Sequence, residues 1–322
     1  MTDRKRLLVT RRLPAAVERA MAERYDATFN ADDIALTAAE LRKAAARYDA
    51  ICTTITDTVD AGVVSADGVR IVANYGAGYE HIDLDAARAA GVVVTNTPDV
   101  LTDATAELAI LLMLAAARRA GEGERQLRAG GWLGWHPTHL IGRSITGKTL
   151  GLIGFGRIAQ ATAARARAGF GMSILYTSRR RADPATEARY QATWIGSVEE
   201  LAARADVVSL HVPGGAATHR MVDAALLSRM RPDTILVNTA RGSVIDEDAL
   251  ALALREGRIA AAGLDVYARE PQVSPGLLAC ENAVLLPHLG SATIETRVAM
   301  GMRALANLDA FFAGKTPGDR VA

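Results

Sequence analysis

Short apolar runs alternate with polar segments along the first hundred residues of the chain. The runs lie at residues 7–10, 50–53, 70–73 and 92–95, and residues 14–21 and 37–46 have the spacing of helices. Runs that are apolar at every position are typical of strands buried on both faces of a parallel sheet. The pattern predicts a small domain in which strands and helices alternate.

The same alternation returns in the second half of the chain. Strands are expected at residues 149–153, 173–176, 207–210, 234–237, 261–264 and 283–286, with helices at 198–203, 224–230 and 247–256. A last helix is expected from residue 291 to about residue 313. This order predicts an α/β fold with doubly wound parallel sheets.

One expected helix, at residues 102–119, differs from the others because its segment 108–117 is apolar on every face. Such a helix must be buried all round, which points to cover from a partner subunit. The loop at 130–137 follows and carries Trp132 and Trp135 among glycines. A large aromatic side chain is a common anchor in an interface pocket, although packing of Trp135 on its own domain is the alternative.

Length, net charge, apolar runs and cysteine content exclude several classes of protein. The 322 residues suit two domains, and a net charge of +1 gives no basic excess for nucleic acid. No apolar run reaches the ~20 residues of a membrane span. Cys52 and Cys280 match no metal spacing, so we expect reduced thiols in a cytoplasmic protein. The histidines also lack metal-ligand spacing, and no metal site is predicted.

A glycine motif follows the expected strand at 149–153. Gly154, Gly156 and Ala159 form the G-x-G-x-x-G/A arrangement of a dinucleotide fold, with Ala159 at the third position. The first glycine allows a tight turn, and the second lets backbone approach a pyrophosphate at a helix N-terminus. The alternative is a glycine-rich turn in another kind of α/β protein.

The next strand ends in a basic turn. Where an NAD-binding fold carries an acid for the ribose 2′-hydroxyl, this chain has Thr177, followed by Ser178, Arg179 and Arg180. Hydroxyl and guanidinium groups suit a 2′-phosphate. The sequence therefore predicts that this turn binds NADPH (NADP+), with NADH as a second cofactor. The alternative is a basic turn that faces solvent and binds no cofactor.

Three polar residues that follow later strands could perform carbonyl reduction. Arg241 can bind a carboxylate, His288 can donate a proton, and Glu270 can orient the imidazole and favour its protonated form. The alternatives are a strand cap, a loop acid and a structural histidine. Another glycine turn, around Ala77 and Gly78, either presents backbone N–H groups to a small anion or is an ordinary turn.

Together these stretches resemble those of a known enzyme family. The chain resembles the D-isomer-specific 2-hydroxyacid dehydrogenases over nearly its whole length, and most of all the glyoxylate/hydroxypyruvate reductases. The matching segments are residues 74–83, 96–107, 130–137, 151–158, 238–242, 263–271 and 287–292.

The resemblance implies two Rossmann-like or flavodoxin-like domains with a cleft between them. Residues 1–97 and 291–322 would form the substrate-binding domain, and residues 98–290 the dinucleotide-binding domain. It implies Arg241, Glu270 and His288 as the catalytic trio, and Arg241, His288, Ala77 and Gly78 as substrate ligands. It also implies that Asp265 holds the nicotinamide amide and that Trp135 reaches the partner's substrate site in a homodimer.

Cofactor contacts are expected at the glycine loop, the basic turn and the strand ends. These residues are Thr102, Gly154, Phe155, Gly156, Arg157, Ile158, Ser178, Arg179, Arg180, His211, Pro213, Thr239, Ala240, Asp265 and Gly290. One departure from the family pattern is Glu80, which stands where these reductases often have aspartate.

The sequence thus favours NADPH-dependent reduction of glyoxylate or hydroxypyruvate. Within the class, the alternative is a reductase of larger 2-keto acids such as pyruvate or phenylpyruvate. From another class, the alternative is a nucleotide-sensing binding protein of the same fold. No nucleic-acid or membrane partner is expected.

Overall fold

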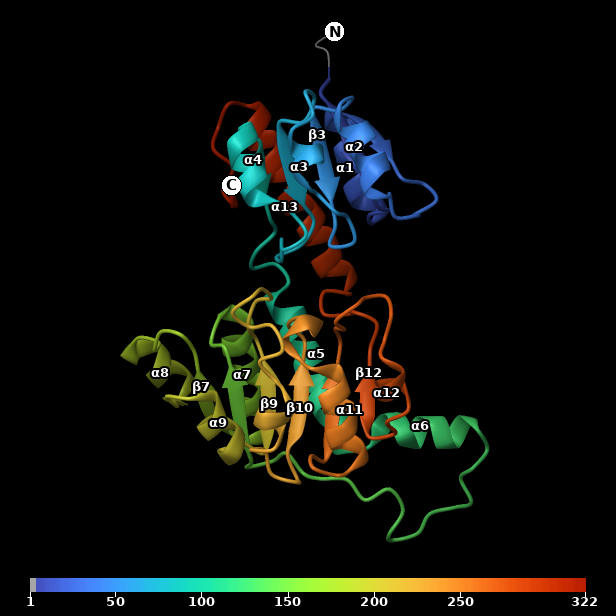
Figure 1. The fold of residues 1–322 in the computed structure, drawn as a ribbon, viewed down its shortest axis with the longest axis vertical. Coiled ribbons are helices and arrows are strands. Elements are labelled where there is room, and N and C mark those ends of the chain that lie inside the picture. The colour runs from blue at the N-terminus through green and yellow to red at the C-terminus, as the bar shows by residue number, and fades with distance from the viewer. Residues whose placement is uncertain (1–3) are drawn as a thin grey trace. The chain divides into compact units, whose positions relative to one another are not determined.

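The computed structural model describes residues 4–322, which fall into two compact α/β units (Figure 1). Unit 1 runs to Leu101 and resumes at Ser291, and unit 2 is Thr102–Gly290. In both units every strand pairs in parallel with its neighbours in the sheet. The sequence prediction of two parallel-sheet α/β domains is therefore confirmed.

Unit 1 is built on a five-stranded sheet in the order β2-β1-β3-β4-β5. Its strands are β1 (Arg6–Val9), β2 (Asp26–Phe29), β3 (Ala50–Thr53), β4 (Ile71–Asn74) and β5 (Val93–Thr95). Its helices are α1 (Ala15–Arg24), α2 (Ala38–Ala45), α3 (Ala61–Val64), α4 (Leu84–Ala90) and α13 (Ile294–Phe312). Strand β2 was not predicted, because this edge strand is only half-buried and has no continuous apolar run.

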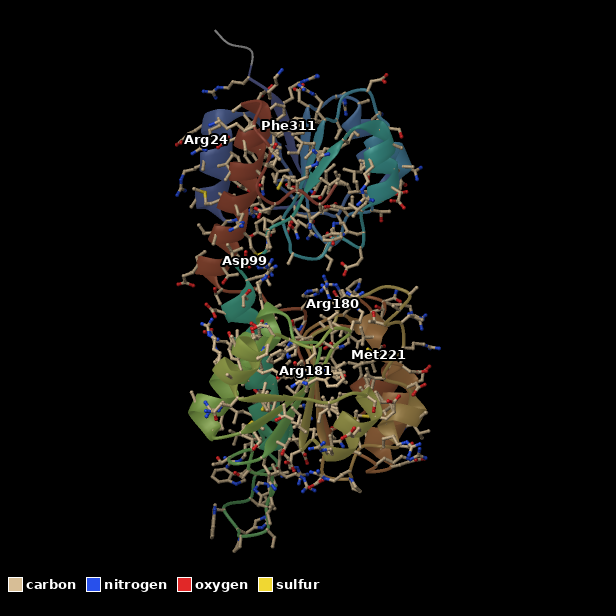
Figure 2. The ribbon with its side chains drawn as sticks, turned by 90° about the vertical axis from the view of Figure 1, so that its left-hand side faces the viewer. Arg24, Asp99, Arg180, Arg181, Met221 and Phe311 are labelled. Carbon is tan, nitrogen blue, oxygen red and sulfur yellow. The ribbon has the colours of Figure 1, made fainter. Side chains whose placement is uncertain are left out.

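The two ends of the chain meet in unit 1. Helix α13 packs against α1, and Tyr25 after α1 donates a hydrogen bond to Asp309 in α13 at 2.9 Å. Arg24 also pairs with Asp309, and Figure 2 labels Arg24 and Phe311 on this unit. The last residues return to β5, where Val321 donates its N–H to the Val94 carbonyl at 2.8 Å. Unit 1 therefore needs both chain ends.

Unit 2 is built on a seven-stranded sheet in the order β12-β11-β10-β9-β6-β7-β8. Its strands are β6 (Thr149–Ile153), β7 (Ser173–Thr177), β8 (Ala192–Trp194), β9 (Val207–Leu210), β10 (Ile235–Asn238), β11 (Ala261–Leu264) and β12 (Ala283–Leu285). The strand order reverses direction between β6 and β9, which is the point where open α/β sheets bind ligands.

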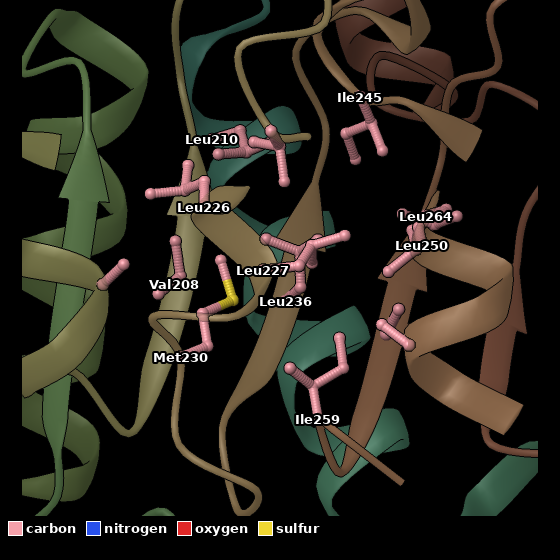
Figure 3. Close-up of a cluster of buried hydrophobic side chains, with 14 of the residues drawn as sticks. Val208, Leu210, Leu226, Leu227, Met230, Leu236, Ile245, Leu250, Ile259 and Leu264 are labelled. Atoms are coloured by element: carbon pink, nitrogen blue, oxygen red, sulfur yellow. The ribbon is translucent and has the colours of Figure 1, made fainter. Parts of the chain in front are cut away.

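Helices cover both faces of this sheet. They are α5 (Thr102–Ala117), α6 (Ala120–Arg128), α7 (Arg157–Phe170), α8 (Pro184–Tyr190), α9 (Val198–Arg204), α10 (Ala224–Leu227), α11 (Glu247–Arg255) and α12 (Pro275–Leu278), with a 3-10 turn η1 (Gly242–Val244). One core lies under α9, α10 and α11, where side chains such as Val208, Leu236 and Leu250 interdigitate (Figure 3). The other lies under α5 and α7.

Helix α5 corrects the expected end of the helix. It ends at Ala117 rather than at residue 119, because Arg119 has a φ of 53° and starts the unpredicted helix α6. Within the single chain Leu111 is 52% exposed while Leu112 and Met113 are fully buried. One side of α5 is thus uncovered, and the expected cover by a partner subunit stays a prediction. None of the helices in residues 4–322 is long and apolar enough to cross a membrane.

Candidate active site

The glycine loop after β6 is shaped by backbone contacts. Gly154 has a φ of 91°, and a Cβ there would lie 2.4 Å from the His211 carbonyl oxygen, so only glycine fits. Gly156 starts α7 without a side-chain cap, and a Cβ there would meet nothing within 4 Å. Within residues 4–322, the N–H groups of Ile158 and Ala159 have no acceptor. These open N–H groups at a helix N-terminus fit a pyrophosphate.

Side chains around this loop hold it in place. The Phe155 ring stacks on Tyr176 with centroids 4.1 Å apart, so that Phe155 can offer a ligand only its backbone. Ala159 is fully buried, as the close packing of α7 on the sheet requires. Both features agree with the expected dinucleotide loop.

The basic turn after β7 is organised by one carboxylate. Glu187 in α8 accepts hydrogen bonds from Arg181 at 2.8 Å and from Tyr176 at 2.7 Å. These two bonds lower the pKa of Glu187 to about 2, which keeps it charged at neutral pH. Ser178 donates to the Arg180 carbonyl at 2.7 Å. Arg181 is therefore occupied by Glu187.

Arg179 and Arg180 differ from Arg181. Both side chains are exposed, and neither has an ion pair with any residue of the described chain. Figure 2 places Arg180 at the margin of unit 2. These two guanidinium groups are available to an anionic ligand.

His288 and Glu270 form a hydrogen-bonded pair. The His288 Nδ1 lies 2.7 Å from Glu270 Oε2, and Glu270 Oε1 accepts the Tyr267 N–H at 3.0 Å. Burial raises the pKa of Glu270, but the bonds from His288 and Tyr267 and the charges of His288 and Arg241 outweigh burial and lower it. The stability contributed by the carboxylate is complete above its ordinary pKa and is lost as the pH falls through the lowered value.

Asp265 supports the loop that carries His288. Its Oδ1 accepts the Leu289 N–H at 2.6 Å and its Oδ2 accepts the Gly290 N–H at 2.8 Å. Burial raises the pKa of Asp265, and these bonds and the His288 charge offset only part of that rise. His288 itself has a φ of 54°, which is unusual for a residue other than glycine. The loop thus positions the imidazole by holding the His288 backbone in a strained conformation.

Arg241 is placed by the close approach of two loops. It follows β10 in extended backbone, and Gly242 after it packs directly on the backbone of Tyr267. A Cβ on Gly242 would lie 1.8 Å from the Tyr267 carbonyl carbon. This contact ties Arg241 to the loop of Glu270, whose pKa the Arg241 charge helps to lower.

The other predicted cofactor residues also lie in unit 2. Burial lowers the pKa of His211 to about 4, so its ring is neutral at pH 7. Its Nε2 is hydrogen-bonded to the Ser209 hydroxyl, 2.9 Å away. Thr105 in α5 donates to the Gly290 carbonyl at 3.0 Å. The rest follow strand ends or begin α5, namely Thr102, Pro213, Thr239 and Ala240.

The glycine turn in unit 1 follows β4. Among residues 4–322, the N–H groups of Ala77 and Gly78 have no hydrogen-bond acceptor. Glu80 beyond them is exposed. The turn therefore has the backbone donors that a small anion needs.

The tryptophan loop is bonded to α6 at its start, through Gly131 and Gln126, but its Trp135 side chain has little contact with its own unit. Trp135 is 82% exposed, and the loop leads into the amino end of β6 (Figure 1). Arg241, Glu270 and His288 instead follow the carboxyl ends of strands. Within unit 2, Trp135 thus lies at the opposite edge of the sheet from these three residues.

Comparisons with known proteins decide the family. The family model for the D-isomer specific 2-hydroxyacid dehydrogenase NAD binding domain matches residues 110–290. The chain is 42% identical to the glyoxylate reductase of Thermococcus litoralis, over 98% of this chain and 96% of that protein. The chain belongs to the D-isomer specific 2-hydroxyacid dehydrogenase family. It is accordingly an oxidoreductase, as the sequence predicted.

Two further relatives of this dehydrogenase describe the range of the family. The glycerate dehydrogenase of Hyphomicrobium methylovorum is 39% identical, over 97% of both chains. An NADPH-dependent glyoxylate/hydroxypyruvate reductase of Sinorhizobium meliloti, solved with NADP and malonate, is 36% identical. It matches with a TM-score of 0.88 over 99% of this chain and 97% of that one.

Proposed function

We propose that this dehydrogenase reduces small 2-keto acids, glyoxylate and hydroxypyruvate, to 2-hydroxy acids with NADPH. The observation that carries the proposal is the His288–Glu270 pair, which follows the strands of the same sheet as the glycine loop. The names of the relatives from Thermococcus litoralis and Sinorhizobium meliloti support the choice of substrate. Unit 2 would bind the nucleotide, and unit 1 would contribute carboxylate ligands.

Each residue has a role in this reaction. NADPH, when bound at the glycine loop, supplies the hydride that the carbonyl carbon accepts. His288 donates the proton from Nε2 to the carbonyl oxygen, because Nδ1 is engaged by Glu270. Arg241 binds and orients the substrate through its guanidinium group. The Ala77 and Gly78 N–H groups bind the carboxylate.

A substrate panel tests the proposal. The purified protein is mixed with NADPH or NADH and with glyoxylate, hydroxypyruvate, pyruvate or phenylpyruvate, and the loss of reduced-cofactor absorbance is followed. Glyoxylate or hydroxypyruvate is expected to give the highest kcat/KM. A preference for phenylpyruvate would indicate a reductase of larger acids, and cofactor binding without turnover would indicate a nucleotide sensor.

Replacing Glu270 with Gln is expected to move the pH profile of reduction. The amide keeps an acceptor for His288 but removes the negative charge that favours a protonated imidazole. The pH dependence of reduction should therefore differ from that of the wild type. The measurement is kcat/KM for glyoxylate from pH 5 to pH 10. An unchanged profile would contradict the pairing, and Glu281→Gln, on an exposed ion pair with Arg125, is the control.

We also propose that the enzyme is a homodimer in which Trp135 reaches the partner's substrate site. The exposed side of α5 around Leu111 and the 82% exposure of Trp135 support this assembly. Trp135 lies at the amino edge of its own sheet, whereas the reactive residues of unit 2 follow the carboxyl edge. Contact with another copy gives both apolar surfaces the cover that each lacks.

Mixed dimers test the role of Trp135. The Trp135→Ala enzyme is expected to have a raised KM for hydroxypyruvate and to accept bulkier keto acids. A Trp135→Ala subunit paired with a His288→Gln subunit has one working site, which combines His288 with the partner's Trp135. That site should keep wild-type substrate preference. A preference like that of the Trp135→Ala enzyme would mean that the tryptophan acts within its own subunit.

A further inference from the structure

Two buried asparagines hold carbonyl groups of the glycine turn after β4, where the Gly76 carbonyl also accepts the Thr97 N–H at 2.9 Å. Asn74 Nδ2 donates to the Gly76 carbonyl at 2.9 Å and to the Gly78 carbonyl at 2.8 Å. Asn96 Nδ2 donates to the Ala77 carbonyl at 2.8 Å. Three successive carbonyl groups are thus turned toward side-chain amides.

Holding the carbonyls fixes the direction of the neighbouring N–H groups. In a trans peptide the C=O of one residue and the N–H of the next lie in one plane and point in opposite directions. The held carbonyls of Gly76, Ala77 and Gly78 therefore aim the N–H groups of Ala77, Gly78 and Tyr79 away from the asparagines. Among residues 4–322 no acceptor meets these three N–H groups. The asparagines create a ready-made cluster of donors.

Within the described chain, only the donor end of the buried Asn74 amide is hydrogen-bonded. Asn74 is 0% exposed, yet its Oδ1 has no hydrogen-bond partner within the described chain. A buried unpaired carbonyl oxygen is unfavourable for folding. The amide is therefore held through its donor end, and that end shapes the turn.

Asn96 is fixed from the other end of the chain. Its backbone N–H donates to the Asp319 carbonyl at 3.2 Å, and its carbonyl accepts from Asn307 Nδ2 at 3.3 Å. Asn307 Nδ2 also donates to the Asp319 carboxylate at 3.0 Å, and Arg303 binds that carboxylate with two bonds. The amide that holds Ala77 is therefore attached to α13 and the C-terminal segment.

We propose that Asn74 and Asn96 are positioning residues for the carboxylate of the substrate. They act through the backbone N–H groups of Ala77, Gly78 and Tyr79 and do not touch the substrate themselves. This inference rests on the proposed function, because it takes a 2-keto acid as the ligand of the turn. Donors that are already aimed need no rearrangement when the anion arrives, which lowers KM.

Asn74→Asp and Asn96→Asp test the proposal. Each replacement has nearly the same shape but places a carboxylate oxygen against the carbonyls that the amide held, and so turns the peptides away. We expect KM for glyoxylate and Ki for oxalate to rise at least tenfold and Kd for NADPH to change little, with the melting temperature falling no further than in the control variant that follows. Asn282→Asp is the matched control, since Asn282 Nδ2 also donates to two carbonyls, of Leu254 and Ala260, at 3.2 and 3.1 Å in unit 2.

The outcomes separate this inference from the proposed function. A wild-type enzyme that reduces no 2-keto acid overturns both. A wild type that reduces glyoxylate, with KM and Ki within twofold of normal in both variants, overturns the positioning role alone. Equal losses in kcat, NADPH binding and melting temperature also overturn it, because a purely structural role predicts that pattern. If Asn74→Asp does not fold, Asn96→Ala, which removes only the bond to Ala77, decides in the same way.

Discussion

Replacement of His288 with Gln is expected to lower kcat for glyoxylate reduction by roughly 10²–10⁴-fold, the usual contribution of a positioned acid. Glutamine can still hydrogen-bond to a carbonyl oxygen, but it cannot give up a proton at neutral pH. The pair with Glu270 at 2.7 Å shows that the ring is held by a charged partner. Steady-state turnover with saturating NADPH measures the effect.

Nucleotide binding is the internal control for this variant. The open N–H groups at the start of α7 belong to another part of unit 2, so Kd for NADPH should stay within about twofold of the wild-type value. A His288→Gln enzyme that kept more than half of normal kcat would remove His288 from the role of proton donor. A large rise in Kd would show that the replacement had disturbed the whole site.

Replacement of Arg179 with Ala should weaken NADPH binding about 10- to 150-fold, since a hydrogen bond to a charged group contributes about 1.5–3 kcal/mol. Arg179 is exposed and has no ion pair within residues 4–322, so its charge is free to meet a 2′-phosphate. Binding of NADH, which lacks that phosphate, should change little. Fluorescence titration with each reduced cofactor measures the two constants.

A neighbouring arginine is the matched control for charge. Arg189 lies in α8 over the Tyr190 ring, 5.4 Å from its centroid, and its loss removes a positive charge from the same region. Arg189→Ala should leave the ratio of the two cofactor constants unchanged. Equal weakening of NADPH and NADH by Arg179→Ala would mean that the turn supports the fold rather than selects the phosphate.

The sequence predicted the buried strands because a central parallel strand is apolar at every position. It did not predict β2 or β8, which lie at sheet edges and carry exposed or polar residues. Helix α6 was missed for a similar reason, since it has no buried residue and lacks an apolar stripe. Edge elements are fixed by neighbours far away in sequence, which local pattern does not describe.

The candidate site residues stay predictions. The sequence suggested Arg241, Glu270 and His288 because each follows a strand, where parallel sheets gather polar residues, and in the structure His288 is hydrogen-bonded to Glu270. The supporting contacts were not found. That Gly242 must lack a Cβ, and that Asn74 and Asn96 hold a turn, depends on distances between segments that the sequence does not state. The hydrogen bonds of Glu187 with Arg181 and Tyr176 likewise could not be predicted from the sequence.

The meeting of both chain ends in unit 1 has a consequence for the order in which a newly made chain can fold. Unit 2 is one uninterrupted segment, so all its strands are available before translation reaches α13. Unit 1 stays incomplete until then, because Met300 and Leu308 of α13 share a core with Val17 and Met21 of α1. While unit 2 is being synthesised, the first hundred residues therefore lack α13, and the apolar face that α13 covers stays exposed. A stop codon just after Gly290 would leave that face exposed for good.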